Sequence, residues 1–125
     1  MPDKIKYADR IPFAFLLDHI LRDDIAIKPM FGCFALYAGG KLSLFLVDRD
    51  EPLVKPDGET MDNGVHVATT VEHVDSLKQD FVDAEFRMLK GGKVWMLIPS
   101  GHARFEDNVI RTCEMIDSRD PRIGR

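Results

Sequence analysis

Two glycine-glycine-lysine segments are the first residues whose types and spacing suggest chemistry. Residues 39–41 and 91–93 both read Gly-Gly-Lys, like part of a phosphate-binding loop. The full loop also needs an earlier glycine, a serine or threonine after the lysine, and a helix that begins there. Leu42 and Val94 follow the lysines instead, and strand-forming residues flank both segments. We therefore predict two hairpin turns that bind no phosphate, because adjacent glycines suit turns with positive φ.

The sequence gives little support for a metal site or for a catalytic nucleophile. No two histidines have the i, i+3 or i, i+4 spacing of a helical metal site, and the two cysteines lie far from each other. The residues concerned are His19, His66, His73, His102, Cys33 and Cys113. No serine lies in the Gly-x-Ser-x-Gly turn of hydrolases, and both cysteines are predicted to be buried as small hydrophobic residues. We therefore predict no catalytic residue, no metal and no cofactor.

Length and composition predict a single globular domain over residues 1–125. Apolar residues make up 45% of the chain and charged residues 30%, which is ordinary for a globular protein. The net charge of −4 has the wrong sign for holding nucleic acid through its phosphates, so no nucleic-acid partner is predicted. The apolar run at residues 11–17 is followed by Asp18 and His19 rather than small residues, and no run is long enough to span a membrane. Together with two cysteines that we expect to be reduced, these features predict a cytoplasmic protein without a membrane partner.

The hydrophobic spacing predicts an α+β fold, in which three helices pack on an antiparallel sheet of about five to six strands. Helical periodicity covers residues 11–24, about 69–81 and about 103–118, with Asp9 and a capping box from Thr69 to Glu72 at two of the helix starts. The predicted strands are residues 25–31, 33–38, 41–47, 65–68, 85–89 and 93–98. Pro29 argues for an edge strand or a bulge. Residues 48–63 form a long loop with room for a short strand at 53–54, and the tail at 119–125 forms no element.

Two of the predicted strands are apolar on both faces. Phe45 and Val47 lie opposite three leucines of their strand, and Trp95 and Leu97 lie opposite Val94, Met96 and Ile98. Three helices on one side of the sheet would leave these four residues, Phe45, Val47, Trp95 and Leu97, as an exposed apolar patch. We therefore predict a homodimer that buries this patch, unless the helices cover both sides of the sheet.

Residues 28–41 resemble the N-terminal domain of the TfoX (Sxy) competence regulators. That family has a basic residue before Met-Phe-Gly-Gly, then a Gly-Leu-Tyr step and a glycine turn into the next strand. The matching residues are Met30, Phe31, Gly32, Leu36, Tyr37 and Gly40, whereas Cys33 and Ala35 stand where the family has glycines. The resemblance implies a small α+β fold similar to that of secretion chaperones, and it does not imply an enzyme. The family's second, C-terminal domain has no counterpart in these 125 residues, so competence regulation is not expected to carry over.

Two functional classes remain open. The first is a non-enzymatic protein-binding or regulatory module that forms a homodimer and meets another protein partner. The second is a small-molecule-binding protein or an unrecognised enzyme. Its pocket would lie where residues 48–63 meet the sheet, near His66, Thr70 and Arg87. We favour the first class, because no set of residues converges on a reactive centre.

Overall fold

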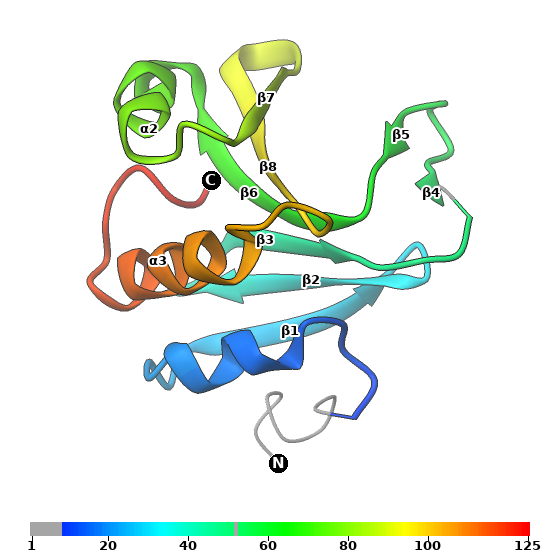
Figure 1. The fold of residues 1–125 in the computed structure, drawn as a ribbon, viewed down its shortest axis with the longest axis horizontal. Helices are drawn as coiled ribbons and strands as arrows, with labels where there is room; N and C mark the ends of the chain where they lie inside the picture. Colours follow the sequence, from blue (N-terminus) through cyan, green and yellow to red (C-terminus); the bar gives the residue numbers. More distant parts are fainter. Residues whose placement is uncertain (1–8, 52) are drawn as a thin grey trace.

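The computed structural model has the α+β architecture that the sequence predicts (Figure 1). It describes residues 9–51 and 53–125. The first eight residues of the predicted 1–125 domain, and Pro52 of the predicted 48–63 loop, lie outside the described residues. Within the described part of the chain, no helix is long and apolar enough to cross a membrane.

A six-stranded antiparallel sheet forms the centre of the molecule, in the order β1-β2-β3-β6-β8-β7. Its strands are β1 (Ile25–Met30), β2 (Cys33–Ala38), β3 (Lys41–Val47), β6 (Gly64–Thr70), β7 (Glu85–Met88) and β8 (Lys93–Pro99). The strand with Pro29 is an edge strand, as predicted, because proline lacks the N–H that a central strand would donate. The predicted short strand exists as β4 (Leu53–Val54), and it pairs with β5 (Thr60–Met61) as a separate two-stranded sheet.

Both glycine pairs lie in connections between antiparallel strands, as predicted. Gly39 and Gly40 have φ of 58° and 81° between β2 and β3, the left-handed conformation that a tight turn requires. Gly91 and Gly92 also have positive φ, but their connection is longer and contains the short 3₁₀ helix η3 (Lys90–Gly92). A strand, not a helix, follows each lysine, so neither segment has the structure of a phosphate-binding loop.

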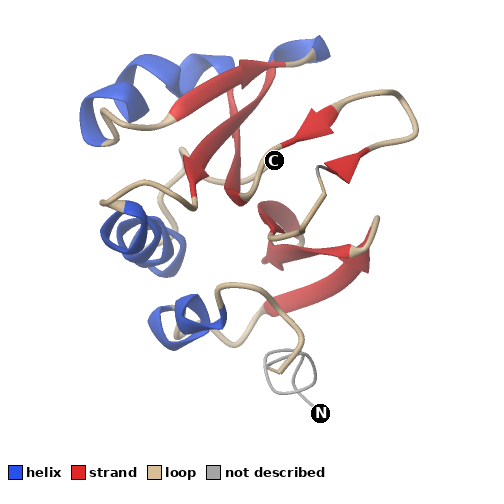
Figure 2. Cartoon of the chain, turned by 45° about the vertical axis from the view of Figure 1, so that its right-hand side comes forward, coloured by secondary structure: helices blue, strands red, loops and turns tan. Residues whose placement is uncertain are grey.

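The helices lie on one face of the sheet (Figure 2). They are the 3₁₀ helices η1 (Ala14–His19) and η2 (Val71–His73) and the α-helices α2 (Val74–Asp80) and α3 (Phe105–Asp117). Alternate strand residues point toward them and form the main core, with Leu44, Val67 and Met96 fully buried. This alternation is the period-2 pattern that identifies the strands in the sequence.

Two predicted helix starts differ in the structure. The first helix covers residues 14–19 rather than 11–24, because Phe13 is left-handed at φ 56° and the Asp117 carboxylate holds the backbone N–H groups of Leu21 and Arg22 at 2.8 and 3.0 Å. Asp9 therefore caps no helix. The predicted capping box is also absent, because the Thr69 hydroxyl donates to the Arg122 carbonyl oxygen at 2.6 Å instead.

The predicted exposed patch of Phe45, Val47, Trp95 and Leu97 is buried within the single chain, so that prediction is wrong. The helices do share one face, but residues 48–63 fold back over the other (Figure 2). Leu53 of β4 and Met61 of β5 pack there against Phe45, Val47 and Trp95 in a second apolar cluster. A short hairpin of the same chain thus covers the surface that was expected to need a second subunit.

The C-terminal tail, residues 119–125, runs along the helix side of the sheet and then joins the sheet itself. β3 and β6 pair only from Leu44 to Val47, and beyond this the tail lies between the two strands (Figure 1). Gly124 donates its N–H to the Ala68 carbonyl at 2.7 Å, and Arg125 and Leu42 exchange both of their backbone hydrogen bonds at 3.0 and 3.2 Å. The tail forms no named element, as predicted, yet it closes a gap in the sheet.

Candidate functional site

A pocket of about 200 Å³ lies between the β4–β5 hairpin and the strands β6, β7 and β8. We call it the hairpin pocket. Its lining residues are Thr60, Asp62, His66, Glu85, Phe86, Arg87, Trp95 and Leu97. The sheet register explains the grouping, because Arg87 lies opposite Trp95, Glu85 lies opposite Leu97, and Leu97 lies opposite His66. Residues directly opposite each other in adjacent strands point to the same face of the sheet, so these side chains lie close together.

His66 is a buried, neutral member of this pocket. Only 4% of it is exposed, and burial lowers the pKa of its imidazole below the usual 6.5. Its Nε2 lies 2.8 Å from the backbone carbonyl oxygen of Asp62. A neutral ring with Nε2–H donating to that carbonyl carries its free lone pair on Nδ1, which makes Nδ1 a hydrogen-bond acceptor.

Arg87 connects the edge strand β7 to the hairpin. Its guanidinium donates to the Thr60 carbonyl oxygen at 2.5 Å and lies 3.8 Å from Oε1 of Glu59. Half of the side chain remains exposed, so this ion pair is partly solvated and contributes little by itself. Its geometry instead fixes the position of the hairpin over the sheet.

Trp95 forms the floor of the pocket and has an unusual set of neighbours. The His66 ring meets it edge-on at a centroid distance of 6.1 Å, and the Arg125 guanidinium lies 4.4 Å from the centroid of the indole ring. The indole Nε1–H is buried, yet it has no hydrogen-bond acceptor among residues 9–51 and 53–125. The same is true of Oε1 of Glu59, which lacks a donor. A buried polar group without a hydrogen-bond partner costs about 1–3 kcal/mol of folding stability. Two such groups in one small protein therefore need an explanation.

Two carboxylates at the pocket are also unpaired. The side chains of Asp62 and Glu85 make no hydrogen bond or ion pair with the part of the chain that the structure describes. Both residues are exposed to solvent. Arg87 is hydrogen-bonded to the hairpin, and His66 is neutral. The charged groups of the pocket that have no partner are therefore negative.

The structure brings together two of the three residues that the sequence nominated for a pocket. His66 and Arg87 line it, and the hairpin of residues 48–63 forms its roof, as predicted. Thr70 does not reach it, because it lies at the far end of β6 and donates its hydroxyl to Glu72 at 3.0 Å. His66 and Thr70 are four residues apart along the strand, which separates them by roughly 13 Å, too far for one small site.

A second pocket, of about 230 Å³, lies beside the tail and contains several cations. Arg22 and Arg119, which line it, are both paired with the Asp24 carboxylate. The remaining cation of the lining is Lys41, and Asp120, the one acid there, is already paired with Arg122. Among the described residues this pocket has no buried polar group without a hydrogen-bond partner, which makes it a weaker candidate than the hairpin pocket.

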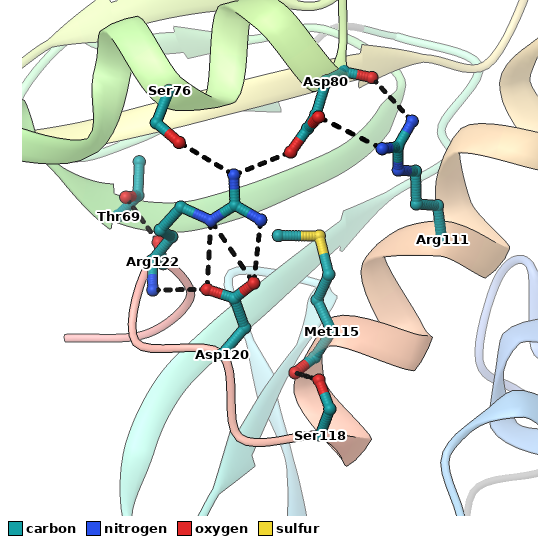
Figure 3. A network of polar contacts seen from close by, with 8 residues as sticks. All are labelled: Thr69, Ser76, Asp80, Arg111, Met115, Ser118, Asp120 and Arg122. Carbon is teal, nitrogen blue, oxygen red and sulfur yellow. Dashed lines mark hydrogen bonds and ion pairs between the residues drawn. The ribbon is translucent and has the colours of Figure 1, made fainter.

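A dense cluster of polar side chains has a structural role and is not a binding site (Figure 3). Arg122 of the tail donates to Asp120 at 2.8 Å, to Asp80 at 2.7 Å and to Ser76 at 2.9 Å. Arg111 of α3 reaches the other side of Asp80 at 3.1 Å. The Asp120 and Asp80 carboxylates raise the pKa of the Arg122 guanidinium, and Arg122 in turn lowers the pKa of Asp120. The donors and acceptors drawn are mutually paired, so the cluster holds the tail to α2.

Sequence reasoning missed Asp62, Glu85 and Trp95 as members of one pocket. Trp95 was assigned to a dimer interface, and the two acids were not singled out. One signal was present: Glu85 and Arg87 alternate along a predicted strand, so they share a face. The predicted two-residue turn at residues 91–92 would pair Arg87 with Met96, and only the longer observed connection places Arg87 opposite Trp95. The cysteines offer no alternative centre, since both are buried and free, and burial raises the pKa of the Cys113 thiol to about 12.

Comparisons with known proteins add no assignment. No family model, no curated protein and no solved structure matches this chain. Among the described residues there is also no group of three or more histidine, cysteine, aspartate or glutamate side chains arranged to hold a metal ion. The resemblance to the TfoX N-terminal domain therefore stays a prediction from sequence, and the function must be argued from the pocket itself.

Proposed function

We propose that this protein is a small-molecule-binding module whose site is the hairpin pocket. The observation that carries the proposal is Trp95, a buried pocket residue whose indole N–H has no acceptor within the described chain. Native proteins pair almost all of their buried polar groups, so the exceptions concentrate where a ligand or water completes the set. The neutral His66 beside it supplies a further unused acceptor.

The site favours binding over catalysis. His66 is the one imidazole in the lining, and Thr60 supplies its one aliphatic hydroxyl. An activated nucleophile needs a base within hydrogen-bond reach and a third group that orients the base. The hydroxyl of Thr60 makes no hydrogen bond with His66 in the structure, whose imidazole is instead bound to the Asp62 backbone. We therefore assign His66 to ligand recognition.

The protein-binding and homodimeric role favoured by the sequence now has weaker support. It rested on an exposed patch, and the single chain covers that patch itself. Homodimerisation stays a prediction that light scattering at low micromolar concentration tests. A dimer of this chain would have to use other surfaces, such as the exposed Val82 and Met88 near the edge strand β7. A cytoplasmic location remains part of the proposal, supported by two cysteines that are both free and buried.

The proposal is tested by following the indole N–H of Trp95 in a ¹H–¹⁵N correlation spectrum. The chain has one tryptophan, so this resonance reports the hairpin pocket without ambiguity. A library of small charged and neutral metabolites, screened at millimolar concentration, should contain compounds that shift it saturably together with the amides of His66 and Leu97. The proposal is contradicted if no compound shifts these resonances while the spectrum remains that of a folded protein.

A further inference from the structure

The edge strand β7 has backbone groups that no other strand covers. It is the last strand of the sheet and pairs with β8 alone (Figure 1). Leu89, just after β7, donates its N–H to the Lys93 carbonyl oxygen at 2.8 Å. In an antiparallel pair, residues that bond to the neighbouring strand alternate with residues whose N–H and C=O groups point away, which here are Phe86 and Met88. Within the described residues these outward groups have no hydrogen-bond partner, so the edge is a template for a further strand.

The opposite edge of the sheet, β1, is less suited to pairing. Gly39 donates its N–H to the Asp24 carbonyl oxygen at 3.0 Å, and the same alternation then places Pro29 at an outward-facing position. Because proline has no N–H, a strand added to β1 would lack a donor there. By contrast, β7 contains no proline, and three of its four residues are exposed. A further strand is therefore expected at β7 rather than at β1.

The charges of β7 are complementary to those of a second β7 that runs in the opposite direction. Glu85 and Arg87 are two residues apart and share one face of the strand. Glu85 has no ion pair in the described chain, and half of the Arg87 side chain is exposed. When Phe86 lies on a two-fold axis, Glu85 of each copy lies opposite Arg87 of the other. Placing either charged residue on the axis would instead put like charges opposite each other, which is unfavourable.

The two ends of β7 add apolar contacts to this pairing. Val82 lies just before the start of the strand and Met88 lies at its end, and both side chains are exposed. Since paired copies of β7 run in opposite directions, Met88 of one copy comes toward the end where Val82 of the other lies. Contact between these ends removes apolar surface from water, which favours association.

We propose that a second copy of this chain pairs with β7, so that two six-stranded sheets join into one across a two-fold axis at Phe86. Phe86 of each copy exchanges both backbone hydrogen bonds with Phe86 of the other, and two ion pairs between Glu85 and Arg87 flank them. This interface uses the edge of the sheet, not the face that bears Trp95. Because Glu85 and Arg87 also line the hairpin pocket, the second copy lies at the rim of that pocket. The inference goes beyond the proposed small-molecule role and does not depend on it.

The first test is the oligomeric state of the full chain as a function of concentration. Two four-residue strands form an interface smaller than the roughly 1,000 Å² of stable complexes, so the dimer should be weak and reversible. Sedimentation equilibrium should show a monomer at about 10 µM that shifts toward a dimer as the concentration rises to about 1 mM, as expected for a small interface. A chain that stays monomeric over this whole range would overturn the inference.

Charge reversal tests whether Glu85 faces Arg87. The variants Glu85→Arg and Arg87→Glu should each weaken self-association about tenfold, because like charges then face one another. An equal mixture of the two variants should regain wild-type association, because every facing pair is again of opposite charge. Glu114→Arg is the matched control, since it makes the same change of charge on the exposed side of α3, and it should leave association unchanged. An equal loss in the control would overturn the inference, as would a mixture that fails to associate although both variants keep the wild-type circular dichroism spectrum.

The register is tested in the wild-type chain without any substitution. In a mixture of isotope-labelled and unlabelled protein, the Hα of Arg87 should give an intermolecular nuclear Overhauser effect to the Hα of Glu85, because the Cα atoms of such a non-hydrogen-bonded pair lie ~4.5 Å apart. Intermolecular effects confined to β1 or to the helices would overturn the inference. The screen on the Trp95 indole resonance, run at a concentration where the chain is monomeric, tests the proposed function separately, so either proposal can fail while the other stands.

Discussion

Two segments of the chain complete the sheet, the tail from the helix side and the β4–β5 hairpin on the helix-free side, and they differ in how completely their polar groups are paired. The tail enters between β3 and β6 and bonds to both strands through Gly124 and Arg125. Its side chains add the Arg122 network and a hydrogen bond from Arg125 to the Val94 carbonyl oxygen at 2.6 Å. At the β4–β5 hairpin and the strand beneath it, by contrast, Oε1 of Glu59 and the indole N–H of Trp95 are buried without hydrogen-bond partners in the described chain.

Trp95 contacts both the tail and the hairpin pocket, so the two regions meet at this residue. Arg125 of the tail lies over its ring, and the hairpin pocket is lined by the same residue. Burial lowers the pKa of the Arg125 guanidinium. Its stacking on the indole ring and its hydrogen bond to the Val94 carbonyl oxygen hold it in this position. A region whose groups are all paired contributes stability, whereas unpaired buried groups cost stability and are kept where they bind something. Variants in each region distinguish the residues that stabilise the fold from those that bind a ligand.

Deleting residues 123–125 should have the largest effect on stability. It removes the buried Ile123 side chain and the backbone hydrogen bonds to Leu42 and Ala68, whose groups would be left unpaired. We expect the free energy of unfolding to fall by about 4 kcal/mol. Urea unfolding followed by circular dichroism measures it. Glu114→Ala, on the exposed side of α3, is the control and should change stability by less than about 0.5 kcal/mol. A loss below about 1 kcal/mol on deletion would show that the tail is only loosely attached.

Arg122→Met should be the next most damaging change. The Arg122 side chain is 22% exposed and pairs with two carboxylates, so its loss should cost about 2 kcal/mol. Arg111→Met is a matched comparison, because Arg111 binds the same Asp80 but is 51% exposed. It should cost no more than about 0.5 kcal/mol. Equal losses for the two variants in the same urea assay would refute the view that the tail network carries the stability.

His66 should make the stability depend on pH. Its pKa in the folded protein is lowered by burial, so the unfolded chain binds the proton more readily than the folded one. The contribution of the neutral ring is complete above the unfolded pKa of about 6.5 and declines as pH falls below it. We expect the free energy of unfolding to fall between pH 7 and pH 5.5, by at most about 1.3 kcal/mol, the limit for a ring that stays neutral in the fold.

The measurement compares wild type with His66→Gln, whose amide can still donate to the Asp62 carbonyl. The glutamine variant should lose less stability over the same pH interval, because it has no imidazole to protonate. Parallel curves for the two proteins would mean that His66 does not hold its neutral form in the fold.

Asp62→Asn and Glu85→Gln should have the smallest effect on folding. Neither carboxylate is paired within the described chain, so each change should alter the free energy of unfolding by less than about 0.5 kcal/mol. The same variants are expected to change severalfold the affinity of library compounds that shift the Trp95 indole resonance. Residues that matter for binding and not for folding are the signature of a functional site. A folding loss above about 1 kcal/mol for either variant would place it with the structural residues of the tail.

The sequence predicts the strands and their turns well because those features are local. Alternation along β3 and β8 and the glycine pairs determine strands and hairpins without reference to the rest of the fold. The first helix was predicted too long, since helical spacing continues through Phe13 although that residue is left-handed. The Asp117 carboxylate that holds Leu21 and Arg22 lies almost a hundred residues away, where local patterns carry no information.

The two covering segments were the part that local patterns could not place. The hairpin buries one apolar residue from each short strand, Leu53 and Met61, which is too little to signal that it docks on Phe45 and Trp95. The tail has turn-like composition, and its hydrogen bonds go to strands far away in sequence. The pocket was therefore predicted at the correct loop and sheet, with His66 and Arg87, but without Asp62, Glu85 and Trp95.

The most direct test of the binding site is to observe a ligand in contact with its walls. Nuclear Overhauser effects between the protons of a bound library compound and the protein can be measured in the wild-type chain. The account predicts contacts to the indole ring of Trp95 and the methyl groups of Leu97. Contacts confined to the other pocket, at Ala38 or Ile116, would contradict it and move the site to the region beside the tail.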